Sequence, residues 1–76
     1  MSEIDLNKID EVVLALLYLT FDEKTFRAWK AMDWAAMDRL HEKGFIGDPK
    51  NKNKSIVFTD EGARVAKSLF EKYFSK

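Results

Sequence analysis

The feature that most constrains the fold is an ordered series of signals over residues 38–62, DRLHEKGFIGDPKNKNKSIVFTDEG. Its first part has helical spacing and ends at Gly44, a residue that favours the left-handed stop of a helix. Residues 45–46 begin a short strand, a lysine-rich turn follows, and the β-branched and aromatic residues 55–58 predict a return strand. Thr59 then caps a new helix. This order predicts a helix, a two-stranded hairpin and another helix.

Apolar residues at three- and four-residue steps predict a first helix from Asn7 to about Thr20, with Asp5 or Asn7 as its cap. A shorter helix is expected over residues 23–30. A third helix is expected over residues 34–43, with Asp33 as its cap. The close spacing of the second and third helices predicts a helix-turn-helix element.

These elements together predict a mainly α chain with a small two-stranded β wing, a winged helix-turn-helix, as one domain over residues 1–76. Trp29 and Trp34 are expected to pack inside, because large aromatic side chains usually fill the core of a small domain. The remaining expected core residues are Ile9, Val13, Leu16, Leu17, Phe26, Met37, Leu40, Ile46, Val57, Ala66, Leu69 and Phe70.

Composition limits the chemistry of the chain. The 76 residues include no Cys and one His, so neither a disulfide nor a protein-only metal site is expected, and no cofactor is predicted. His41 has the acids Asp38 and Glu42 near it in sequence, but Ser and Thr show no paired arrangement with it, and no catalytic residue is predicted. The apolar run at residues 12–19 is too short to span a bilayer, and the N-terminal residues lack a signal pattern, so a cytoplasmic protein is expected.

Charge is unevenly distributed although the net charge is zero. Residues 1–23 carry −5, residues 24–54 carry +4 and residues 55–76 carry +1. A surface that contacts a polyanion should therefore come from the middle third of the chain. The basic residues expected to meet phosphates are Lys24, Arg27, Lys30, Arg39, Lys50, Lys52 and Lys54.

Each basic group also has a plainer interpretation. The lysines of the turn could belong to a solvated hairpin tip, where Lys and Asn are favoured. On the third helix, Arg39 and Lys43 are balanced by Asp38 and Glu42, which favours a solvated face with local ion pairs.

A homodimer is also expected, because the first helix is apolar nearly all round. Its contacts are expected at Tyr18, Tyr73 and Phe74.

Two resemblances follow from these motifs. Residues 40–46, LHEKGFI, and 57–62, VFTDEG, look like the wing of MarR-type and PadR-type bacterial regulators, with Phe58 where those families usually have Leu. Over its whole length the chain resembles a family of small bacterial proteins catalogued only as a domain of unknown function. That second resemblance lies in residues 14–20, 27–30, 33–34 and 40–44, and it implies no activity.

The sequence thus leads to two hypotheses. The first is a small accessory regulator, not an enzyme, that binds DNA or another nucleic acid through its basic middle third. The second is a protein-interaction module that has the winged fold without DNA binding. Zero net charge and the acids of the third helix favour this alternative.

Overall fold

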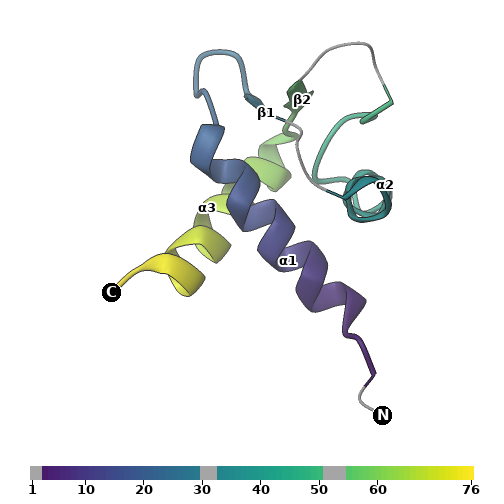
Figure 1. The fold of residues 1–76 in the computed structure, drawn as a ribbon. Helices are drawn as coiled ribbons and strands as arrows, with labels where there is room; N and C mark the ends of the chain where they lie inside the picture. Colours follow the sequence, from purple (N-terminus) through teal and green to yellow (C-terminus); the bar gives the residue numbers. More distant parts are fainter. Residues whose placement is uncertain (1–2, 30–32, 51–54) are drawn as a thin grey trace.

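The computed structural model describes residues 3–29, 33–50 and 55–76, in which helices and short strands alternate along the chain (Figure 1). Residues 30, 52 and 54, three of the predicted phosphate-binding lysines, lie outside the described residues. The elements are α1 (Leu6–Leu17), the 3₁₀ turn η1 (Tyr18–Thr20), β1 (Arg27–Trp29), α2 (Trp34–Glu42), β2 (Ser55–Val57) and α3 (Asp60–Phe74).

The first helix forms where its apolar periodicity predicts it. Asp5 is the N-cap, and its carboxylate accepts a hydrogen bond of 3.1 Å from the backbone N–H of Lys8. The last turn tightens into η1, which ends at Thr20. Figure 1 shows α1 crossing in front of α3, and it also packs against α2. The helix therefore contacts both of the other helices.

The caps of α2 and α3 are those that the sequence predicts. Asp33 accepts from the N–H of Ala36, and Gly44 follows α2 with a φ of +81°, the left-handed conformation of a helix stop. The Thr59 hydroxyl accepts from the N–H of Gly62 at 2.9 Å and donates to the carbonyl of Gly44 at 2.7 Å. One side chain thus joins the end of α2 to the start of α3.

The predicted helix over residues 23–30 is wrong. Asp22 does not cap a helix; its carboxylate accepts from the N–H of Lys24 in a tight turn. Phe26 takes a left-handed φ of 58°, which breaks any helical run, and β1 follows directly. The described residues between Thr20 and Asp33 therefore contain no helix, and the first half of the predicted helix-turn-helix is not formed there.

The sheet has two antiparallel strands, β1 and β2, in the register Arg27↔Val57, Ala28↔Ile56 and Trp29↔Ser55. The predicted hairpin strand at residues 45–46 contributes one bridge, between Ile46 and Phe58. The return strand expected over residues 55–58 was predicted correctly. It pairs over more residues with β1, which precedes α2 in the chain, than with residues 45–46. The fold is therefore mainly helical with a two-stranded sheet.

Buried apolar side chains from all three helices and both strands form one core, and half-buried aromatic rings extend it. The half-buried rings of Tyr18 and Phe26 and the buried ring of Phe58 each pack against the half-buried ring of Phe21, with centroids 5.1–5.4 Å apart. The fully buried apolar residues are Val13, Leu14, Ala15, Leu17, Ala28, Ala36, Met37, Leu40, Ile46, Ile56, Phe58 and Ala66.

Four residues that were expected in the core lie at the surface. Trp29 is 59% exposed and Trp34 is 58% exposed. Ile9 is on the outer side of α1 with 38% of its surface open, and Val57 is also exposed. The reason at Val57 is strand register: Ile56 and Phe58 point inward, so the residue between them points to solvent.

Candidate functional site

The outer face of the strand pair presents a basic and an aromatic side chain side by side along β1. Ala28 and Ile56 point into the core, so Arg27 and Trp29 point outward with Val57 and Ser55 opposite them. The guanidinium of Arg27 donates to the Ser55 hydroxyl at 3.1 Å across the strands. This bond holds the arginine on the outer face.

A shallow depression of about 180 Å³ lies beside Trp29. The backbone N–H of Trp29 donates to the Thr20 hydroxyl at 2.9 Å, which fixes the end of β1 against η1. Trp29 therefore has a fixed backbone and an open indole. The residues that line the depression are Thr20, Asp22, Thr25, Arg27, Ala28, Trp29 and Ser55.

The predicted phosphate-binding residues separate into two groups. Lys24 is exposed in the turn that precedes β1, and Arg27 lies on the outer face of that strand. Lys50 is exposed next to Pro49 and is the last residue of the described range 33–50. Arg39, in contrast, turns toward the helices. The structure thus places Lys24 in the turn before β1 and Arg27 in β1 itself, and it directs Arg39 toward Asp10.

Arg39 and Lys43 converge on one buried carboxylate. Asp10 is 1% exposed, and the Arg39 guanidinium lies 2.8 Å from it through Nη2 and 2.9 Å through Nε. The Lys43 ammonium lies 2.8 Å from its other oxygen. Burial by itself raises the pKa of Asp10, but the hydrogen bonds and charges of the two bases outweigh it and hold that pKa below its ordinary value. The bond to Asp10 also raises the pKa of Arg39.

Sequence reasoning missed this cluster. It paired Arg39 and Lys43 with acids of their own helix and gave Asp10 no basic partner. A signal was present, because Asp10 lies three, four and seven residues before Val13, Leu14 and Leu17, on the inner face of α1. An acid on an inner helix face requires a basic partner from another element.

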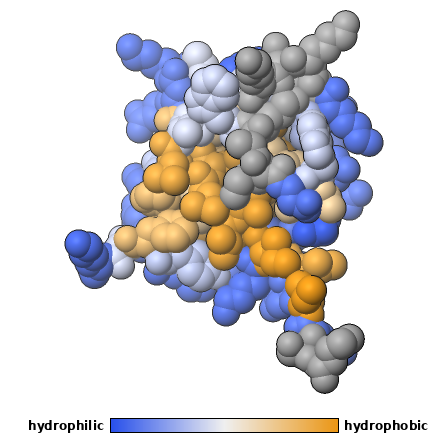
Figure 2. Space-filling view, in the orientation of Figure 1, coloured by the Kyte–Doolittle hydropathy of each residue, from blue (hydrophilic) through white to orange (hydrophobic). Residues whose placement is uncertain are grey.

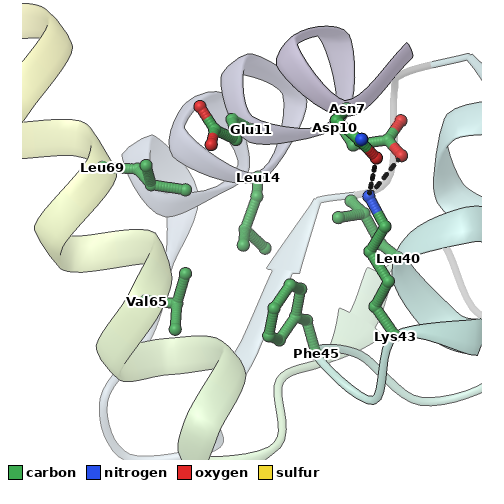
Figure 3. Close-up of a pocket in the computed structure, with 9 residues that line it drawn as sticks. All are labelled: Asn7, Asp10, Glu11, Leu14, Leu40, Lys43, Phe45, Val65 and Leu69. Carbon is green, nitrogen blue, oxygen red and sulfur yellow. Dashed lines mark hydrogen bonds and ion pairs between the residues drawn. The ribbon is translucent and has the colours of Figure 1, made fainter.

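A second pocket, of about 410 Å³, opens between α1, α2 and α3 (Figure 3). Leu14, Phe45 and Val65 point into it, and polar groups stand at its edge. These polar groups already bond to neighbours: Lys43 donates to Asn7 at 3.2 Å, and Tyr73 donates to Glu11 at 2.6 Å. The pocket is therefore an apolar gap bordered by satisfied groups.

His41 and the acidic side chains form no metal-binding group in the described parts of the chain. Nδ1 of His41 lies 3.0 Å from the carbonyl of Ile46, which ties the ring to the segment after α2. Within residues 3–29, 33–50 and 55–76, no three His, Asp or Glu side chains gather closely enough to hold a metal ion. Over the same residues, no helix is long and apolar enough to cross a membrane.

The expected dimer residues already make contacts within the chain. Tyr18 is half-buried and packs against Phe21 and Phe70. The Tyr73 hydroxyl donates to Glu11, and that bond raises the pKa of Tyr73. Phe74 is exposed beside Phe70 at the end of α3. Of the three, Phe74 has the most open surface.

A larger apolar surface lies on the outer side of α1. Ile9, Val12, Val13 and Leu16 line a groove of about 560 Å³, with Asp5 and Lys8 at its N-terminal end. Figure 2 shows this surface as a band that runs over the front of α1 toward the N-terminus. The sequence predicted a helix that is apolar nearly all round, and the structure identifies the side that the core leaves uncovered.

Comparison with known proteins returns similarity without an assigned activity. Residues 5–76 match the family model described as "Domain of unknown function (DUF6429)". The chain is 55% identical over 74 residues to "Uncharacterized protein y4hR" of Sinorhizobium fredii (strain NBRC 101917 / NGR234). That alignment covers 97% of this chain and 99% of the relative. No solved structure matches the chain significantly.

Proposed function

Because this chain belongs to the DUF6429 family, whose description gives no activity, we propose a function from its own geometry: it binds nucleic acid through the outer face of β1 and β2. The observation that carries this proposal is Trp29, an indole that is 59% exposed next to an outward-facing arginine. An exposed aromatic ring offers a base a stacking surface, and a neighbouring guanidinium offers a phosphate a partner.

The charges of the described residues support contact with the phosphates of a nucleic acid rather than the reading of base edges by α2. Lys24 and Lys50 are exposed and, with Arg27, supply three positive groups for phosphates. On α2, Asp33 caps the helix, and the Arg39 side chain is held by Asp10. A recognition helix normally presents Arg, Lys, Asn or Gln to base edges. We therefore assign α2 a supporting role.

The finer fold that we propose is a winged helix with a shortened helix-turn-helix. The bridge between Ile46 and Phe58 supports a hairpin after α2, and α2 would occupy the place of the recognition helix. The turn at residues 22–27 and β1 would replace the helix that ordinarily precedes it. In this arrangement the strand face, rather than α2, provides the contact surface.

The experiment is a titration of a fluorescently labelled oligonucleotide, single-stranded and as the duplex of the same sequence, at low salt. We expect binding to both, with Trp29→Ala weakening the single-strand affinity by about 5- to 150-fold, the value of one stacked base. Trp29→Phe should restore most of the affinity, because phenylalanine also stacks. Absence of binding at low salt would reject the proposal.

Salt dependence provides a second measure. Lys24→Ala and Arg27→Ala should each reduce the slope of log K against log salt by about 0.7 on the single strand, the contribution of one phosphate contact. Lys72→Ala is the matched control, because it removes the same charge from the last turn of α3, far from the strands in Figure 1. Equal effects at all three positions would indicate nonspecific attraction instead of a site.

The second candidate is a protein-interaction module without nucleic-acid binding. The apolar groove on the outer side of α1 favours it, since such a surface is suited to another apolar surface rather than to a polyanion. The oligonucleotide titration separates the two candidates. Failure to bind either nucleic acid would leave the interaction module as the better account.

A further inference from the structure

The outer face of α1 has a pattern suited to pairing with another helix. Ile9, Val12 and Leu16 of α1 and Leu19 of the following turn η1 recur at steps of three, four and three residues. Ile9 and Leu19 are 38% and 64% exposed. Val12 and Leu16, which lie between them, are half-buried. Alternating steps of three and four residues form the apolar seam of helix pairs. We call these four residues the α1 seam.

The spacing of the α1 seam is the same read in either direction. A two-fold axis beside residue 14 would therefore place Ile9 opposite Leu19 of a second copy, and Val12 opposite Leu16. Each apolar side chain then meets an apolar side chain, and the same patch serves both partners. A helix from an unrelated protein would need to match this spacing, whereas a second copy matches it by symmetry.

Charge selects the direction of pairing. Asp5 and Lys8 are the charged residues that line the groove, both at its N-terminal end, and residues 12–21, VVLALLYLTF, carry no charge. Antiparallel packing sets this charged end of each helix against the uncharged half of the other. Parallel packing would set Asp5 of one copy beside Asp5 of the other copy, and Lys8 beside Lys8. These like charges would repel each other. The antiparallel arrangement also places opposite ends of the two helix dipoles together.

We propose that two copies of this chain form an antiparallel, two-fold dimer through the α1 seam. This moves the expected dimer contact from Tyr18, Tyr73 and Phe74 to the outer side of α1. None of the four residues of the α1 seam lines the depression beside Trp29, so the dimer and nucleic-acid binding can be tested separately. The interface would cover the groove lined by Ile9, Val12, Val13 and Leu16.

Sedimentation equilibrium over about 1–100 µM tests the dimer. We expect wild-type dimers and self-association weakened by about 100-fold or more in Leu16→Lys, because the symmetry places two lysines in one apolar interface. Ile9→Lys is a second variant at a more exposed position, and circular dichroism verifies its fold. Phe74→Lys is the matched control and should remain dimeric. A wild-type monomer, or a dimer broken only by Phe74→Lys, overturns the proposal.

Cross-linking tests the direction. The chain has no Cys, so a single introduced cysteine reports on one position. Under air oxidation, a mixture of Val12→Cys and Leu16→Cys chains should form mostly the mixed disulfide, at a yield several-fold above that of either variant alone. Predominant Val12→Cys homodimers would indicate parallel packing and overturn the proposed axis. Absence of every cross-link in a sedimenting dimer would overturn the α1 seam as its interface.

Discussion

At the scale of single residues, Asp10 is the polar group on which the docking of α1 against α2 depends. Its carboxylate is enclosed, and Arg39 and Lys43 bring two positive charges within 2.8 Å of its oxygens. A buried charge is tolerated when it is paired and hydrogen-bonded, and here both oxygens have partners. Removing the acid would leave Arg39 and Lys43 without this buried ion-pair partner.

The lowered pKa of Asp10 predicts how stability depends on pH. Because the folded pKa lies below the ordinary value, about 3.9 for Asp, the ionised carboxylate stabilises the fold above that value. The contribution is lost as pH falls from about 4 through the lower folded pKa. Urea unfolding at pH 7 and near pH 3 should show a larger loss in the wild type than in Asp10→Asn.

At pH 7, Asp10→Asn should cost about 1–3 kcal/mol, since the amide leaves charged partners imperfectly satisfied. Glu3→Gln provides the control for the pH series, because Glu3 is an exposed acid near the same end of the chain. An Asp10→Asn variant with the same pH profile as the wild type would contradict the assigned role of the ion pair.

Gly62 is required for a steric reason. It lies in the first turn of α3, where a Cβ would overlap the backbone carbonyl of Phe45. Gly62→Ala should therefore lower the free energy of unfolding by about 1–3 kcal/mol, the usual cost of overpacking. Gly47→Ala is the matched control, since its Cβ would lie 3.7 Å from the Val57 carbonyl oxygen, an ordinary contact. Thermal unfolding of the two variants should separate them clearly.

At the scale of elements, the pairing of β1 with β2 determines which side chains reach solvent. Ile56 faces the core opposite Ala28, and its neighbour Val57 faces outward beside Arg27. Shifting the register by one residue would exchange these two faces. The surface that we assign to nucleic acid therefore exists because of this register.

Two threonine substitutions measure the register. Ile56→Thr should destabilise the fold by about 2 kcal/mol, because it removes buried apolar surface and buries a hydroxyl. Val57→Thr should change stability by no more than about 0.5 kcal/mol, since its side chain is exposed. Chemical denaturation checks both values. Equal losses at the two positions would contradict the inward and outward assignment.

The elements also show how far the sequence could predict the fold. Caps are local features: Asp33 and Thr59 were recognised from neighbouring residues, and Asp5 was one of the two candidates for the cap of the first helix. The segment at residues 23–30 was misassigned, because its helical spacing is overridden by pairing with a strand about 28 residues later. Nothing local signals that partner. Phe26 and its left-handed backbone are a product of the same long-range pairing.

At the scale of the whole molecule, the two tryptophans show what the sequence could not supply. Composition favours burying large aromatics, yet the core is already filled by leucines, Met37 and the rings around Phe21. Which aromatic remains outside depends on the register and on the helix faces. On the outer face of β1, Arg27 was predicted in advance as a phosphate-binding residue, whereas Trp29 was expected in the core and its exposure required the structure.

The α1 helix has two apolar sides with different neighbours. The inner side, with Leu14 and Leu17, packs in the core, and the outer side carries the α1 seam. Apolar periodicity identified the excess of hydrophobic residues but not their division between the two sides. That division requires the positions of α2 and α3, which only the folded chain provides.

The ion pair of Asp10 also has a meaning for how the chain finds its fold. Apolar seams between helices tolerate a slip of one turn, because one aliphatic contact replaces another at small cost. A one-turn slip of α2 along α1 would leave Asp10 with at most one of Arg39 and Lys43, because these two bases lie one turn apart. Breaking part of a buried ion-pair cluster costs more than forming the cluster gains. We therefore expect this buried acid to favour the native alignment of α1 with α2 over shifted alignments.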